Sequence, residues 1–124
     1  MWYHRYDETD NAITTPVSSG KIHAIYLQVI RLANRSAHTE QPMAALTLKA
    51  GAVVKKATNG SKYGRHAEWR AIRGKSEADT IIVARHNGRM SRPCLDCQEV
   101  LRDFGIQKMI YANRYSVLVY ERLI

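Results

Sequence analysis

The pattern of apolar and polar positions in the first half of the chain predicts a helix followed by a β-hairpin. Apolar residues recur at helical spacing between Lys21 and Ala37, which predicts the first helix there. Two short strand-like runs follow, at Ala44–Lys49 and Ala52–Ala57. Ala50 and Gly51 separate these runs, and a two-residue connection with glycine at a positive φ is typical of a tight hairpin.

The second half of the chain alternates helical and strand-like segments. A second helix is predicted at His66–Arg73, with Gly74 in the left-handed position that ends many helices. Thr80–Ala84 is a continuous, β-branched run that is typical of a central strand buried on both faces. A third helix is expected at Pro93–Phe104, because proline is well placed in a first turn, and Gly105 would cap it.

The last two strands are predicted at Lys108–Ala112 and Ser116–Tyr120. Only residues 113–115 connect them, which is too short for the crossover of a dozen or more residues that parallel strands need. The two strands are therefore expected to be antiparallel. The complete order predicts an α/β fold in which helices cover a five-stranded mixed sheet.

Length and composition indicate one compact domain. The chain has 124 residues, of which 45% are hydrophobic, enough for a core without disulfides. We expect a polar, irregular arm at residues 1–20 and the folded domain at residues 21–124. The sequence has no apolar run of about 18 residues and no signal-like start, which predicts a cytoplasmic (intracellular) protein without a membrane partner.

The net charge of +8 leaves two interpretations open. The surface is simply basic, or the protein meets an anionic partner, either a nucleotide phosphate or a nucleic-acid backbone.

The strongest chemical signal is a pair of short motifs at two predicted helix starts. His66 and Glu68 form H-x-E, and Cys94 and Cys97 follow a proline in P-C-x-x-C. Cysteines three apart in a first turn share one face, and the helix N-terminus favours the thiolate that binds zinc. With His66 as a third ligand, the fourth position is left for water, which is the layout of a catalytic zinc site.

Glu68 is placed to act beside the metal without binding it. Bound zinc lowers the pKa of water from about 16 towards about 7. A neighbouring carboxylate can take a proton from that water and return protons to a ring nitrogen and a leaving amine. The pattern therefore points to hydrolytic deamination.

Other interpretations of the cysteine pair fit less well. A structural zinc site would need a fourth ligand, and neither His23 nor His86 has a useful spacing. A redox pair would normally follow the first strand of a βαβ unit, whereas this pair comes late in the chain. Either motif alone occurs by chance, but the two in this order are specific.

The combined motifs are the signature of zinc-dependent deaminases, and Lys21–Ile124 resembles the cytidine deaminase-like superfamily in motif and element order. The resemblance implies a three-layer fold with helices on both sheet faces. It also implies Zn²⁺ bound by His66, Cys94 and Cys97, with Glu68 as general acid/base. The expected final hairpin is similar to the branch of free cytidine deaminases, blasticidin-type and toxin deaminases, and to small phage-type deaminases. Deoxycytidylate and tRNA adenosine deaminases, whose last strand is parallel, are less similar.

The chain departs from free cytidine deaminases in two ways. His66 stands where they have cysteine; histidine is more usual among nucleotide and nucleic-acid deaminases. Asn59 is similar in position to the asparagine of their ribose-binding pair, but no glutamate is evident to complete the pair. Six residues are candidate substrate contacts, each with a turn, core or solvated-loop role as its alternative: Asn59, Tyr63, Arg89, Ser91, Arg92 and Arg114. Of these, the loop residues Arg89, Ser91 and Arg92 are expected to contact a phosphate.

The leading hypothesis is conversion of cytosine to uracil in a free (deoxy)cytidine nucleoside or nucleotide, an activity of nucleotide metabolism. A cytosine deaminase acting on single-stranded DNA or RNA is the alternative. A zinc-stabilised, nucleic-acid-binding module without activity is the third hypothesis. A homo-oligomer is expected by analogy, because superfamily members are often dimers or tetramers.

Overall fold

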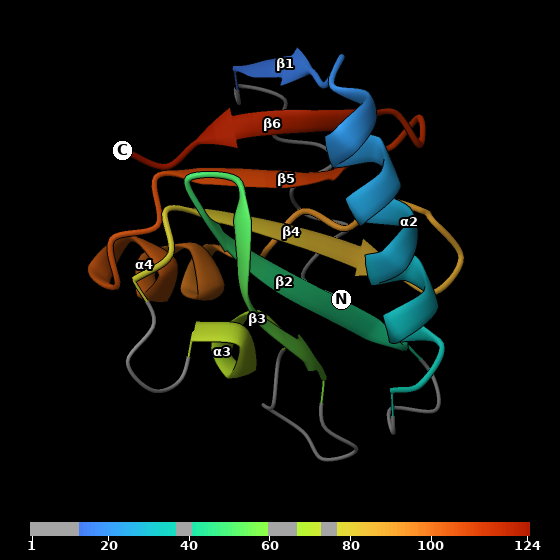
Figure 1. The fold of residues 1–124 in the computed structure, drawn as a ribbon, viewed down its shortest axis with the longest axis horizontal. Coiled ribbons are helices and arrows are strands. Elements are labelled where there is room, and N and C mark those ends of the chain that lie inside the picture. Colours follow the sequence, from blue (N-terminus) through green and yellow to red (C-terminus); the bar gives the residue numbers. More distant parts are fainter. Residues whose placement is uncertain (1–12, 37–40, 60–66, 73–76) are drawn as a thin grey trace.

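The computed structural model describes residues 13–36, 41–59, 67–72 and 77–124. The elements in chain order are β1 (Thr14–Pro16), α2 (Gly20–Ala33), β2 (Met43–Lys49), β3 (Ala52–Thr58), α3 (Ala67–Ile72), β4 (Thr80–Arg85), α4 (Leu95–Asp103), β5 (Lys108–Ala112) and β6 (Leu118–Arg122). The strands form one sheet in the order β1-β6-β5-β4-β2-β3, which can be followed from top to bottom in Figure 1.

The sheet has six strands, so the expectation of five was wrong. The additional strand, β1, lies in the segment that was expected to be an irregular arm, and it pairs antiparallel with β6 through Thr14 and Glu121. All three residues of β1 are exposed, so no alternation of buried and exposed side chains marks this strand in the sequence. It forms because β6 offers a free edge.

The sheet is mixed, as expected. β4 and β5 are parallel, and β2 pairs antiparallel with both β3 and β4. β5 and β6 are antiparallel, which confirms the final hairpin. However, β6 begins at Leu118, two residues later than predicted, because Ser116 takes a φ of 61° and the side chain of Asn113 accepts two backbone hydrogen bonds within the loop.

Helices cover both faces of the sheet, which confirms the three-layer arrangement. One buried cluster holds Val29 of α2 together with Leu46 and Ile82, and the cluster on the other face holds Leu101 of α4 together with Ile81. Ile81 and Ile82 are both 0% exposed. Successive residues of β4 therefore point into opposite cores, as a central strand requires.

The ends of α4 differ from the prediction on one side only. The helix begins at Leu95 and not at Pro93, because Cys94 has an extended backbone and is the N-cap. At the other end Gly105 takes a φ of 85°, and the N–H groups of Gly105 and Ile106 donate back to carbonyls of the last turn. This pattern is a Schellman motif, so the predicted glycine cap is confirmed.

α2 is shorter than predicted: it starts at Gly20, where the hydroxyl of Ser19 accepts the N–H of Ile22, and it ends at Ala33. α3 is helical over all of its described residues, Ala67–Ile72. The predicted helix residues His66 and Arg73, with the glycines predicted around them, lie outside the described residues. No helix in the described ranges is both long and apolar enough to span a bilayer.

The two ends of the sheet carry different features. At one end, Lys49 pairs with Ala52 across a turn in which both Ala50 and Gly51 have positive φ values. This is the predicted hairpin, with one more left-handed residue than expected; the N–H of Ala50 donates to Asp79 at 3.0 Å. At the other end lie the start of β2, the ends of β3, β4 and β5, and the residues that lead into α4.

Candidate active site

Glu68 is buried at the start of α3. It is the second residue of the helix and only 1% exposed, and Ala67 beside it is equally buried. Its carboxyl group lies near the thiol of Cys97 on α4, where its negative charge helps to raise the pKa of that thiol. The fold therefore joins the H-x-E and P-C-x-x-C segments, although a complete strand separates them in the sequence.

Cys94 and Cys97 share the first turn of α4. Cys94 is the N-cap, and its Sγ accepts the N–H of Cys97 at 3.4 Å. The two side chains are 6% and 1% exposed, and neither forms a disulfide. The expected one-face placement of the cysteines at a helix N-terminus is thus present.

The three groups form one buried acidic cluster. The hydrogen bond with Cys94, burial, and the negative charges of Glu68 and Cys94 all raise the pKa of the Cys97 thiol. A divalent cation among them would reverse this balance by stabilising the thiolates. The two thiols are donors that suit Zn²⁺, and the carboxylate lies beside them.

The third expected ligand, His66, lies outside the described residues. Within the described ranges, no group of three potential metal ligands is assembled. In the sequence, His66 lies two residues before Glu68.

A buried polar scaffold holds the segment that enters α4. Ser91 is 0% exposed, and its Oγ donates to the carbonyl of Val83 at 2.8 Å and accepts the N–H of Ala112 at 3.1 Å. The last paired residues of β4 and β5 are Ile82 and Ile110, so Ser91 bridges the two strands where their ladder stops. Its hydroxyl is already used in holding the sheet together.

The profile of one protein family matches this region. The family is described as the cytidine and deoxycytidylate deaminase zinc-binding region, and the match covers residues 20–113. The chain belongs to this family. It is therefore a zinc-dependent hydrolase of the deaminase type, and Zn²⁺ is its cofactor. The match runs from α2 to the end of β5 and stops before β6.

The fold of this deaminase is similar to that of a solved structure, a dCMP deaminase from the cyanophage S-TIM5 in apo form. The TM-score is 0.52 with 19% sequence identity over 73% of this chain and 83% of that chain. No curated protein matches the sequence significantly. The superfamily resemblance is confirmed, while the branch stays a prediction. The neighbour's name belongs to the branch expected to be less similar, yet β6 here is antiparallel to β5.

The side chain of Arg92 forms an ion pair with Glu121. Its Nε and a terminal guanidinium nitrogen donate to the two carboxylate oxygens of Glu121, each at 3.0 Å. The hydroxyl of Tyr111 donates to the same carboxylate at 2.7 Å. Burial, then Glu121, raise the pKa of Tyr111, so the phenol stays protonated as a donor. This arrangement gives Arg92 an internal partner in place of the expected phosphate.

Asn59 is likewise held inside the deaminase fold. It is 8% exposed; its Oδ1 accepts the N–H of Met43 at 3.0 Å and the hydroxyl of Ser36, and its Nδ2 donates to the carbonyl of Gln41 at 2.8 Å. These bonds tie the end of β3 to the start of β2. The expected match to a ribose-binding asparagine therefore falls on a side chain with a structural role.

The remaining candidate contacts differ in exposure. Arg89 is exposed, and its N–H donates to Asn87 in a local turn. Arg114 is exposed at the tip of the β5–β6 hairpin, where its guanidinium lies 5.2 Å from the ring centre of Tyr115. Tyr63 lies outside the described residues. For Arg89 and Arg114, binding of an anionic ligand stays a prediction.

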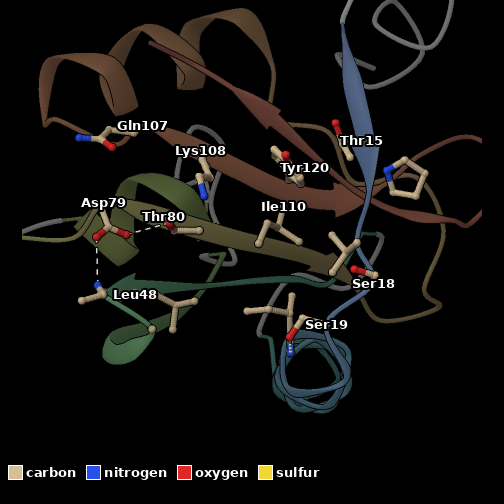
Figure 2. Close-up of a pocket in the computed structure, with 15 residues that line it drawn as sticks. Thr15, Ser18, Ser19, Leu48, Asp79, Thr80, Gln107, Lys108, Ile110 and Tyr120 are labelled. Atoms are coloured by element: carbon tan, nitrogen blue, oxygen red, sulfur yellow. Dashed lines mark hydrogen bonds between the residues drawn. The ribbon is translucent and has the colours of Figure 1, made fainter.

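A hollow of about 570 Å³ lies at the opposite end of the sheet. Figure 2 shows it between the N-terminus of α2 at Ser19 and the strand residues Lys108 and Tyr120. Asp79 at its rim already accepts hydrogen bonds from Ala50 and Thr80. The hollow contains none of the motif residues, so it is not the zinc site.

Sequence reasoning missed three polar residues that support the site. Gln98 is 3% exposed, and its Nε2 donates to the carbonyl of Pro93 at 2.8 Å. Tyr111 and Glu121 complete the contacts of Arg92. None of the three belongs to a short motif, and Glu121 follows the predicted last strand, Ser116–Tyr120, so no local signal marked it.

Proposed function

We propose that this protein converts cytosine to uracil in a free (deoxy)cytidine nucleoside or nucleotide by zinc-dependent hydrolysis. His66, Cys94 and Cys97 are the proposed zinc ligands, and Glu68 is the proposed general acid/base. The observation that carries the proposal is that the fold buries the Glu68 carboxyl group near the Cys94 and Cys97 thiols, at the starts of two helices. Membership of the deaminase family supports it.

The reaction replaces the amino group of cytosine by the oxygen of water and releases ammonia. Zinc, when bound, supplies the Lewis acidity that brings the pKa of water towards neutrality. The carboxylate of Glu68 accepts a proton from the attacking water and delivers protons to the ring nitrogen and the departing amine. Burial of Glu68 keeps bulk water away from this proton transfer, because the side chain is 1% exposed.

The loop before α4 favours a small substrate over a polymer. Of the three loop residues expected to contact phosphate, Ser91 is buried in the sheet and Arg92 is paired with Glu121. Arg89 is the exposed one of the three. One exposed arginine suits a single phosphate group better than a nucleic-acid backbone, which binds through several cations.

One observation favours the alternative substrate, single-stranded DNA or RNA. A hollow of about 440 Å³ beside β3 is lined by three cationic residues, Lys55, Lys56 and Arg70. Lysines on an edge strand also prevent strand-to-strand aggregation, which is a sufficient reason for two of them. The net charge of +8 agrees with either role.

The test is to supply zinc-loaded protein with deoxycytidine, deoxycytidine monophosphate and a cytosine-containing single-stranded oligonucleotide, and to measure uracil products by mass spectrometry. We expect product from the small molecules. Product from the oligonucleotide alone would contradict the proposal and support the alternative. In that case Lys55→Gln with Lys56→Gln should reduce the salt slope of oligonucleotide binding by roughly 0.7 per lost phosphate contact.

A further inference from the structure

The connection between β6 and the start of α4 is more elaborate than a loop anchor requires. The guanidinium of Arg92 donates two parallel hydrogen bonds of 3.0 Å to the carboxylate of Glu121, and the hydroxyl of Tyr111 donates a third to the same carboxylate. The side chains of Arg92 and Glu121 are 12% and 10% exposed, so the pair is largely removed from water. This two-bonded pairing fixes the relative orientation of the two side chains as well as the distance between them, because guanidinium and carboxylate are both planar.

The position of this pair relates it to the metal site. Arg92 lies two residues before Cys94, and Pro93 between them has a fixed φ. The carbonyl of Pro93 is held from the other side by Gln98 of α4. Orientation imposed on Arg92 is therefore passed along a short, rigid connection to the N-cap cysteine.

Stability alone is a weak reason for this arrangement. A buried ion pair costs desolvation energy, and apolar side chains of the same volume often stabilise a fold equally well. Pairs of this kind are more useful where a single geometry has to be specified. The first turn of α4 is such a place, because Cys94 and Cys97 both have to meet one metal ion.

We propose that Glu121, acting through Arg92, is a positioning residue for the metal site: it sets the orientation of the Arg92–Cys94 segment and thereby the geometry of the Cys94 thiolate. The inference rests on the ligand set of the proposed function. It extends the site to β6, which lies beyond the region matched by the family profile. The final hairpin thus has a role in the zinc site and not only in the sheet.

The test measures the metal site without any substrate. Wild-type protein and the variants Glu121→Gln and Arg92→Lys are loaded with Co²⁺ for absorption spectra and with Zn²⁺ for transfer to a chelator. Arg92→Lys keeps the charge but cannot form the two-bonded pairing. Arg102→Lys is the matched control: Arg102 also binds the C-terminal segment, through its Nε and the carbonyl of Leu123 at 3.1 Å, but at the far end of α4.

We expect Glu121→Gln and Arg92→Lys to shift the thiolate-to-cobalt bands and to weaken zinc binding about 10–100-fold, the usual effect of losing a residue that orients a metal ligand. Arg102→Lys should change neither measurement. Folded variants with wild-type cobalt spectra and zinc transfer would overturn the proposal. If Glu121→Gln does not fold, Arg92→Lys decides alone. Wild-type protein that binds metal but converts no cytosine would instead contradict the proposed function and leave this inference standing.

Discussion

Replacing Ser91 by alanine separates a structural role of this residue from a role in substrate binding. The hydroxyl of Ser91 donates to Val83 and accepts from Ala112, and all three residues are at most 1% exposed. Alanine removes the partner of a buried carbonyl and of a buried amide at once. No water can reach these groups without opening the junction of β4 and β5.

The size of the effect follows from these two groups. Leaving one buried polar group unsatisfied costs about 1–3 kcal/mol, so the loss of two partners in Ser91→Ala should lower the free energy of unfolding by roughly 2–6 kcal/mol. This is a large part of the 5–15 kcal/mol that is typical of a small domain. With a urea m-value of about 2 kcal/mol/M, the unfolding midpoint should fall by roughly 1–3 M.

The assay is urea unfolding of the zinc-loaded protein, monitored by circular dichroism. KM for the best substrate is measured separately, without denaturant. The exposed Ser18 provides the control, and Ser18→Ala should unfold like the wild type. A Ser91→Ala protein that loses less than about 0.5 kcal/mol but has a raised KM would refute this reasoning. That result would support a role of Ser91 in substrate binding.

Three further predictions concern the backbone, the metal and pH. Gly105→Ala should lower the melting temperature by roughly 3–6 °C, because a Cβ at φ 85° costs about 1 kcal/mol although the space is open, whereas Gly20→Ala should not lower it. Chelation of zinc should lower the melting temperature of the wild type but not of Cys97→Ala, as measured by scanning calorimetry; equal shifts would exclude Cys97 as a ligand. Hydrogen bonds from Ala50 and Thr80 lower the pKa of Asp79, so its stabilisation is complete above the unfolded pKa and is lost as the pH falls below about 4. Asp79→Asn should therefore be less stable than the wild type in urea at pH 7. A difference in stability between the two proteins that is as large at pH 3 as at pH 7 would contradict this.

The elements with strong local signals were the ones that the sequence predicted well. β4 and the β2–β3 hairpin appear within one residue of the expected bounds, because runs such as Thr80–Ala84 and the Ala50–Gly51 turn carry local signals. β1 carries no such signal, since its residues are exposed and its pairing depends on the edge of β6.

The site shows the same division. The two motifs predicted the helix starts that carry Glu68, Cys94 and Cys97, because each motif needs only a local helix start. The roles of these residues in zinc binding and catalysis stay predictions. The roles of Arg92 and Asn59 were not readable, because their partners are set by the sheet. Arg92 meets Glu121 only once β6 lies beside β5, and Asn59 meets Met43 only once β2 and β3 have paired. Polar residues beside a motif were therefore taken as substrate contacts when the fold uses them itself.

The measurement that tests the central claim most directly compares wild-type protein with Glu68→Gln, both loaded with zinc, on deoxycytidine and deoxycytidine monophosphate. The amide keeps the shape of the side chain but cannot carry the proton. We predict that Glu68→Gln retains stoichiometric zinc and the wild-type melting temperature, while its turnover to the uracil product falls by about 10²–10⁴-fold. Turnover by Glu68→Gln within a few-fold of the wild type would contradict the assignment of Glu68 and the mechanism built on it.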